Sequence, residues 1–139
     1  MAGLRIARAT SADDIAGAAP LFDQGLLPDA VTRFLADDRH HLLVAYAGGA
    51  AVGFVSGVEM THPDKGTEMF LYELAVAEPF RRRGTGRALV RELAALARER
   101  GCYGMWVGVD AGNDVALATY RSAGGKDDGV CPGVTWDFG

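Results

Sequence analysis

The chain has few of the residues that form metal sites, disulfide frameworks or membrane spans. Its 139 residues include two cysteines, Cys102 and Cys131, without a CxxC spacing, and only three histidines. We therefore expect two free thiols, no zinc site and no histidine-based nucleophilic triad. No run approaches the roughly 20 apolar residues that cross a bilayer, and the N-terminus has no apolar signal core. These features predict a cytoplasmic protein with no metal and no membrane partner.

Positive charge is also scarce. Lysine and arginine number 14 against 18 acidic residues, which gives a net charge of -4. Because binding to a phosphate backbone needs a basic surface, this balance argues against nucleic acid as a partner and favours, weakly, a positively charged substrate. Hydrophobic residues make up 49% and charged residues 23%, as in globular proteins. The length predicts a single domain over residues 1–139.

The spacing of apolar residues predicts alternating strands and helices. Expected strands cover residues 4–9, 40–47, 50–60, 68–76, 102–110 and 133–138. Expected helices cover residues 12–23, 28–38, 84–100 and 114–123. The pair "GG" at 48–49 and the turn "THPDKG" predict a run of hairpins. This order indicates an α+β or mixed α/β layered fold.

The stretch "FLYELAVAEPFRRRGTGRALV", residues 70–90, passes from a strand into three arginines, two glycines and a helix. Backbone N–H groups at a helix start bind anions, glycines let an anion approach the backbone, and arginines add charge-assisted hydrogen bonds. The spacing is neither that of a Walker loop nor that of a dinucleotide-binding turn. The residues alone leave two interpretations open, a diphosphate site and a solvated basic surface.

The pattern R-x-x-G-x-G, formed by Arg81, Gly84 and Gly86 directly after "LAVAEPF", resembles that of the GNAT superfamily of acetyl-CoA-dependent N-acetyltransferases. The resemblance implies an acyltransferase with a mixed, mostly antiparallel sheet that is splayed between strands 4 and 5. It implies that the Val76 amide polarises the thioester carbonyl of acetyl-CoA and that the arginine turn holds the diphosphate. The cofactor-binding residues implied in this segment are Leu74, Ala75, Val76, Arg81, Arg82, Arg83, Gly84, Thr85, Gly86 and Arg87.

A second segment, "NDVALATYRSAGG", is similar to the family pattern N-x-x-A-x-x-x-Y-x-x-x-G. Asn113 and Tyr120 are seven residues apart, which is about two helical turns, so we expect them on one side of a helix. The resemblance implies that Tyr120 protonates the departing CoA thiolate and that Asn113 contacts the cofactor arm. Gly125 departs from the family pattern, in which an aromatic residue is common at this position.

Acetyl transfer to an amine requires that the ammonium first lose a proton, and a carboxylate is the usual acceptor. Glu73 precedes Val76 by three residues, and strand alternation predicts that it faces away from Tyr72 and Leu74 unless a bulge alters the parity. Asp110 ends the strand expected at 102–110 and is the second candidate, for substrate binding or as a base. The residues leave open which of the two is the base, or whether a water intervenes.

Within the superfamily, "LYELAV" and the pair Asp110 and Asp114 resemble the aminoglycoside 3-N-acetyltransferase branch. This resemblance implies a small polyamine as acceptor, and the superfamily resemblance suggests a homodimer. A protein amino-group acetyltransferase is an alternative. A non-catalytic acyl-CoA-binding module is another, which Tyr120 and a candidate base both disfavour. A nucleic-acid or membrane contact through Arg81–Arg83 is disfavoured by the acidic composition.

Overall fold

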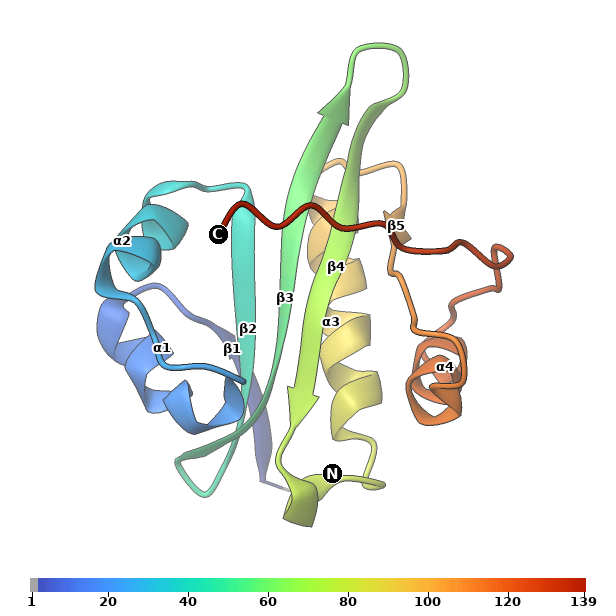
Figure 1. Ribbon diagram of the computed structural model, residues 1–139. Helices are drawn as coiled ribbons and strands as arrows, with labels where there is room; N and C mark the ends of the chain where they lie inside the picture. Colours follow the sequence, from blue (N-terminus) through green and yellow to red (C-terminus); the bar gives the residue numbers. More distant parts are fainter. Residues whose placement is uncertain (1–2) are drawn as a thin grey trace.

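A five-stranded sheet forms the centre of the computed structural model, which describes residues 3–139 (Figure 1). The strands are β1 (Leu4–Arg8), β2 (His40–Ala47), β3 (Ala50–His62), β4 (Gly66–Val76) and β5 (Met105–Trp106). The α-helices are α1 (Ala12–Gly17), α2 (Pro28–Ala36), α3 (Thr85–Glu99) and α4 (Asp114–Ser122). The strands lie in sequence order, antiparallel except for the parallel pair of β4 and β5. The mixed, mostly antiparallel sheet is therefore confirmed.

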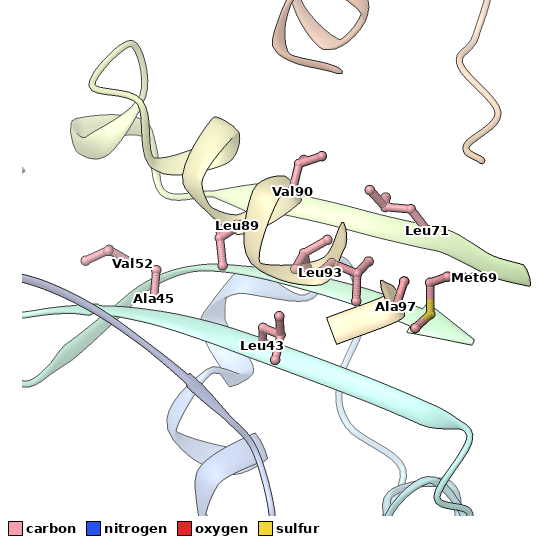
Figure 2. Close-up of a cluster of buried hydrophobic side chains, with 10 residues drawn as sticks. Leu43, Ala45, Val52, Met69, Leu71, Leu89, Val90, Leu93 and Ala97 are labelled. Atoms are coloured by element: carbon pink, nitrogen blue, oxygen red, sulfur yellow. The ribbon is translucent and has the colours of Figure 1, made fainter. Parts of the chain in front are cut away.

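The two faces of the sheet carry separate hydrophobic clusters because successive strand residues point to opposite faces. Leu43, Val55 and Leu71 pack with Leu89 and Leu93 of α3 on one face (Figure 2). On the other face Leu42, Val44 and Phe54 pack with residues of the α1–α2 region. Burial of these side chains fixes the register of β2 and β3, and β3 is the strand on which β4 pairs.

Helix α1 is shorter than the sequence predicted. Its start is as expected, because the Ser11 hydroxyl caps it by accepting a hydrogen bond from the Asp14 N–H at 3.1 Å. The helix ends at Gly17 instead of continuing to residue 23, and a 3₁₀ turn, Ala19–Leu21, follows. Pro20 has no N–H to continue α-helical hydrogen bonding, which explains the early end.

Two predictions near the C-terminus were wrong. The strand expected at 102–110 is reduced to Met105–Trp106, and the strand expected at 133–138 has no regular structure. The alternation of Val134, Trp136 and Phe138 with polar residues is strand-like, but a strand also needs a partner for its backbone groups. These three side chains are exposed, and the segment passes in front of the sheet in the view of Figure 1.

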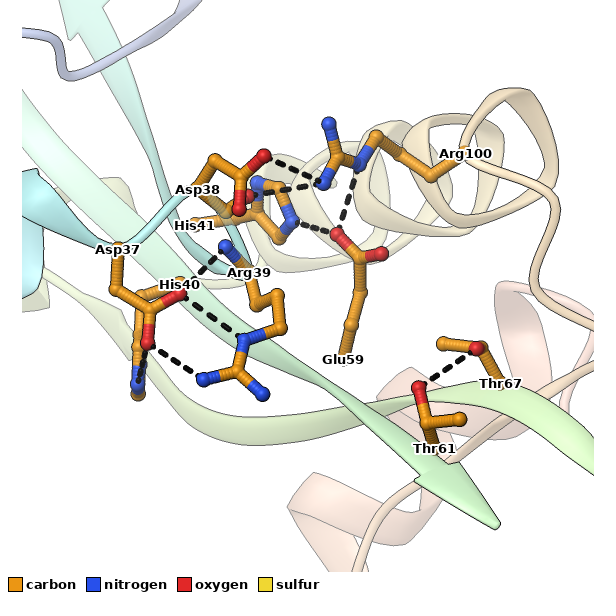
Figure 3. Close-up of polar contacts among 9 residues, drawn as sticks. All are labelled: Asp37, Asp38, Arg39, His40, His41, Glu59, Thr61, Thr67 and Arg100. Carbon is orange, nitrogen blue, oxygen red and sulfur yellow. Dashed lines mark hydrogen bonds and ion pairs between the residues drawn. The ribbon is translucent and has the colours of Figure 1, made fainter. Parts of the chain in front are cut away.

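A polar cluster joins the far end of α3 to the sheet (Figure 3). His41 is fully buried, and its Nε2 lies 2.6 Å from Oε2 of Glu59. Arg100, the residue after α3, donates from Nε to the same oxygen at 2.8 Å and from a terminal nitrogen to the Asp38 carbonyl at 3.1 Å. Burial lowers the pKa of His41 below its ordinary value. Hydrogen bonds from His41 and Arg100 lower the pKa of Glu59, although burial alone would raise it.

Three expectations concern what the chain lacks. Cys102 and Cys131 are both free thiols, as predicted. Over residues 3–139, no helix has both the length and the apolar character needed to span a bilayer. In the same range, no group of three or more His, Cys, Asp and Glu side chains has an arrangement suited to a metal ion.

Candidate active site

The edge of β4 that faces β5 is open along most of its length. The two strands pair only at Met69 with Met105 and at Phe70 with Trp106. From Leu71 to Val76, no other strand of the described chain pairs with this edge. The Ala77 N–H donates to the Val52 carbonyl of β3, so by alternation the N–H groups of Leu74 and Val76 point to the open edge.

A β-bulge in β4 sets the faces of the following residues. Ser56 of β3 pairs with Glu73 and its neighbour Gly57 pairs with Leu71, so Tyr72 is an extra residue. Leu71 packs in the cluster under α3, and Leu74 and Val76 pack against the same cluster. Glu73 therefore faces away from α3, toward the side of α1 and α2. The expectation that Glu73 faces away from Leu74 is confirmed.

The expectation that Glu73 and Tyr72 point to opposite faces of the sheet was wrong, because the bulge places these two successive side chains on one face. Tyr72 contacts Phe70 edge-on, and Phe70 alternates with the buried Met69 and Leu71. Tyr72 and Glu73 thus both face away from α3. Notably, Tyr72 is 67% exposed and Glu73 is half-buried.

Burial raises the pKa of Glu73, and the negative charge of Asp23 adds to that effect. Asp23 follows Phe22, whose ring stacks on Phe54 of β3 with centroids 4.3 Å apart. Phe54 is two residues before Ser56, the partner of Glu73. This stack explains how a residue from the irregular segment before α2 comes near β4. No motif in the sequence marked Asp23, because its proximity depends on a tertiary contact.

The arginine turn between β4 and α3 has the backbone shape of an anion site. Arg82 has a φ of 63° and Gly84 a φ of 82°, two left-handed residues separated by Arg83. The first helical hydrogen bond of α3 runs from the Ala88 N–H to the Gly84 carbonyl, so the N–H groups of the first turn have no acceptor within the helix. Such alternating turns and helix starts make concave sets of N–H donors that suit phosphate oxygens.

The side chains of the turn brace it from within. Arg81 donates from Nε to the Val76 carbonyl at 2.9 Å. Thr85 is buried, and its hydroxyl donates to the Phe80 carbonyl at 3.4 Å. The guanidinium of Arg83 lies 5.4 Å from the centre of the Phe80 ring. Arg82 and Arg87 are exposed, and across residues 3–139 neither forms an ion pair.

Gly86 has a packing role. A Cβ at this position would lie 3.3 Å from Cγ2 of Thr119 in α4, and Leu74 and Val76 are the next nearest side chains. Its missing side chain therefore lets α4 approach the start of α3 and the end of β4. This contact brings the helix that carries Tyr120 to the open edge of β4.

Tyr120 lies in α4 and packs partly buried against the cluster under α3, and burial raises the pKa of its hydroxyl. Asn113 is the N-cap of α4 and lies directly before its first residue, so the expectation that it shares one side of the helix with Tyr120 stays a prediction. Its side-chain oxygen accepts a hydrogen bond from the Ala116 N–H at 3.1 Å, and its NH₂ group has no acceptor among residues 3–139. Gly124 follows Ala123, the C-cap of α4, and has a φ of 102°.

Asp110 does not end a strand. It lies four residues beyond β5, its side chain is exposed, and its carbonyl accepts a hydrogen bond from the Asn113 N–H at 3.0 Å. The fold thus brings Leu74, Val76, Gly86 and the Tyr120 helix together at one junction. Glu73 lies at the same strand but on the opposite face, and Asp110 belongs to the turn that leads into α4.

The fold is a mixed, mostly antiparallel sheet with helices on both faces, and at this junction an open strand edge leads to a turn with the backbone shape of an anion site. The chain matches the acetyltransferase (GNAT) family over residues 11–124 and belongs to that family.

Two curated relatives show the range of proteins that resemble the chain. It is 36% identical over 97 residues to the N-alpha-acetyltransferase RimI of Mycobacterium tuberculosis, covering 70% of this chain and 59% of that protein. It is 37% identical over 124 residues to the mycothiol acetyltransferase of Salinispora tropica, covering 84% of this chain and 36% of that protein. The chain therefore spans less than two thirds of the length of either relative.

Solved structures share the fold at low sequence identity. One is an aminoglycoside acetyltransferase from an uncultured soil metagenomic sample in complex with sisomicin, with a TM-score of 0.85, 20% identity and 97% of each chain covered. Another is the aminoglycoside N-acetyltransferase AAC(6')-Iy in complex with CoA, with a TM-score of 0.83, 19% identity and coverage of 96% and 94%.

Proposed function

We propose that this protein transfers the acetyl group of acetyl-CoA to a primary amine by direct attack in a ternary complex. The observation that carries the proposal is the continuity of donors along one path. The N–H groups of Leu74 and Val76 point to the open edge of β4, and the same path ends at the turn of Arg82 and Gly84. An extended pantetheine arm with a terminal diphosphate fits such a sequence of donors.

Acetyl-CoA supplies the thioester, and the residues of the chain bind and orient it. The Val76 N–H donates to the thioester carbonyl, which makes the carbonyl carbon more electrophilic. The N–H groups from Arg82 to Arg87 bind the diphosphate, and Arg82 and Arg87 add positive potential. Leu74 lines the arm through its backbone N–H, Ala75 lies in the strand between the donors of Leu74 and Val76, and the NH₂ group of Asn113 is a further donor.

Two side chains move protons in this proposal. Glu73, with its pKa raised by burial, accepts the proton of the incoming ammonium, directly or through a water. Tyr120, whose pKa is also raised by burial, stays protonated at neutral pH and donates to the departing thiolate. A raised pKa helps each group, because it strengthens Glu73 as a base and keeps Tyr120 a donor. Asp110 is the second candidate for acceptor binding.

Two acceptor classes are supported by different observations. The negative charges of Glu73 and Asp23 lie near one another on the side of α1 and α2, which suits a small polyamine such as an aminoglycoside. The likeness to an N-alpha-acetyltransferase supports a protein or peptide N-terminus instead. In either case the acceptor amine approaches on the face that Glu73 shares with Tyr72.

The test is an acetyl-CoA turnover screen with aminoglycosides, linear polyamines and peptide N-termini, which detects released CoA with DTNB. We expect saturable turnover with at least one amine class and acetylated product by mass spectrometry. If acetyl-CoA binds by calorimetry but no amine is acetylated, the protein is a non-catalytic acyl-CoA-binding module. If acetyl-CoA gives no thermal protection while unrelated polyanions do, the turn is a general anion surface and the proposal is wrong.

A further inference from the structure

Arg81 connects two parts of the proposed site that bind different ends of the cofactor. Its Nε donates to the Val76 carbonyl at 2.9 Å, which is the last carbonyl of β4. Its own backbone begins the turn, because the next residue is the left-handed Arg82. The guanidinium therefore spans from the strand end, where the thioester is expected, to the turn, where the diphosphate is expected.

The local backbone needs such a brace. A left-handed φ of 63° at Arg82 is strained for a residue with a side chain, and it persists only where neighbouring contacts hold it. The side-chain contacts of the turn are the Arg81–Val76 hydrogen bond, the Thr85–Phe80 hydrogen bond and the placement of Arg83 over Phe80. Only the first of these three joins the turn to β4 itself.

We propose that Arg81 is a positioning residue whose Nε–H, and not its charge, holds the diphosphate turn in register with the end of β4. This inference rests on the proposed function for its catalytic consequence. It assigns Arg81 a role different from that of a direct phosphate ligand. Because its Nε–H donates to the Val76 carbonyl, Arg81 affects acetyl-CoA binding by positioning the backbone of Val76 and Arg82.

Three substitutions separate the hydrogen bond from the charge. In Arg81→Gln the side-chain nitrogen is the same number of bonds from Cα as Nε of arginine, so the donor remains while the charge is lost. In Arg81→Lys the charge remains, but the nitrogen is one bond farther out and the planar donor at the Nε position is gone. Arg81→Met removes both. Arg91→Gln, at an exposed position of α3, is the control for the change in net charge.

The first measurement is amide hydrogen exchange over residues 76–84 of the free protein, which needs neither cofactor nor turnover. We expect wild-type protection in Arg81→Gln and Arg91→Gln, and faster exchange by about 3- to 10-fold in Arg81→Lys and Arg81→Met, as for loss of one net hydrogen bond. Equal exchange in all variants would overturn the proposal whether or not the protein is an acetyltransferase.

The second measurement is the dissociation constant of acetyl-CoA, with kcat and KM where an acceptor is found. We expect the acetyl-CoA dissociation constant of Arg81→Gln to stay within about 3-fold of the wild-type value. In Arg81→Lys and Arg81→Met we expect the affinity to fall by about 3- to 10-fold and kcat to fall as well. If Arg81→Lys binds acetyl-CoA like wild type and Arg81→Gln loses as much affinity as Arg81→Met, then the charge of Arg81 contacts phosphate and the proposal is wrong. If the wild-type protein does not bind acetyl-CoA, the proposed function is wrong. The hydrogen-exchange result still tests whether the Arg81 Nε–H holds the turn.

Discussion

The backbone N–H of Glu73 donates to the hydroxyl of Ser56 at 3.1 Å, at the point where β4 has one residue more than β3. A ladder carbonyl would ordinarily accept this hydrogen bond, so the Ser56 side chain replaces a lost backbone acceptor beside the bulge. The same bulge turns Glu73 toward Asp23 and leaves Leu74 and Val76 facing α3. One inserted residue therefore separates the proposed base from the hydrophobic side of the strand.

The first prediction concerns the pH dependence of turnover. Because Asp23 adds to the burial that raises the pKa of Glu73, Asp23→Asn lowers that pKa. Turnover requires ionised Glu73, so the acidic limb of the kcat profile shifts to lower pH in Asp23→Asn. Glu73→Gln lowers kcat by about 10²- to 10⁴-fold, the usual range for a general base. Asp13→Asn is the control and keeps the wild-type profile. An acidic limb that also stays in place in Asp23→Asn would contradict an effect of Asp23 on the pKa of Glu73.

The second prediction concerns Tyr120. Removing its hydroxyl in Tyr120→Phe keeps the packing against the cluster under α3 and deletes the proton donor. We expect kcat to fall by about 10²-fold or more, while the calorimetric affinity for acetyl-CoA stays close to wild type. Tyr103→Phe, at an exposed tyrosine, is the control. Unchanged turnover in Tyr120→Phe would remove this residue from the mechanism.

The third prediction concerns Gly84. A Cβ there meets no atom within 4 Å, but its φ of 82° is strained for any residue with a side chain. Gly84→Ala therefore costs about 1–2 kcal/mol in the native turn, and we expect weaker acetyl-CoA binding and a lower melting temperature. Gly104→Ala is the matched control, because it also meets no atom within 4 Å and has no left-handed φ. Equal effects of the two substitutions would contradict a conformational role for Gly84.

The fourth prediction concerns stability and the buried His41. Burial lowers its pKa, and within residues 3–139 its Nδ1 has no hydrogen-bond partner. The unfolded chain binds the proton at the ordinary pKa near 6.5. Unfolding therefore takes up a proton below that pH, and stability falls by up to about 1.4 kcal/mol per pH unit as the pH drops.

Urea unfolding at pH 7 and pH 5.5 measures this effect. In His41→Gln we expect the difference between the two pH values to shrink, whereas His40→Gln, at a partly exposed neighbour, keeps the wild-type difference. The paired carboxylate of Glu59 adds its own loss of stability only at lower pH, because its pKa is below 4.5. A His41→Gln protein with the full wild-type difference would contradict the assignment to His41.

The sequence was enough to predict the order of elements through α4 and the motif at the arginine turn. Strand and helix periodicity and the R-x-x-G-x-G spacing are local signals, and they predicted β4 and α3 to within two residues. The start of α1 was also local, because Ser11 caps it. The family resemblance rested on the same local patterns.

The remaining features depend on contacts between distant residues. The bulge at Tyr72 follows from how β3 and β4 pair, and Asp23 reaches Glu73 only through the stack of Phe22 on Phe54. The use of Arg81 as a brace likewise depends on the position of the Val76 carbonyl. The wrong strand at 133–138 shows the converse, since a correct local pattern does not form a strand without a paired edge.

The most direct test of the central claim is amide hydrogen exchange of the wild-type protein with and without acetyl-CoA. We predict that acetyl-CoA slows exchange in two segments, residues 74–76 at the open edge of β4 and residues 82–87 at the turn, and that ADP slows exchange only in the second. Protection at the turn alone with no effect on residues 74–76, or protection of neither segment, would contradict the account.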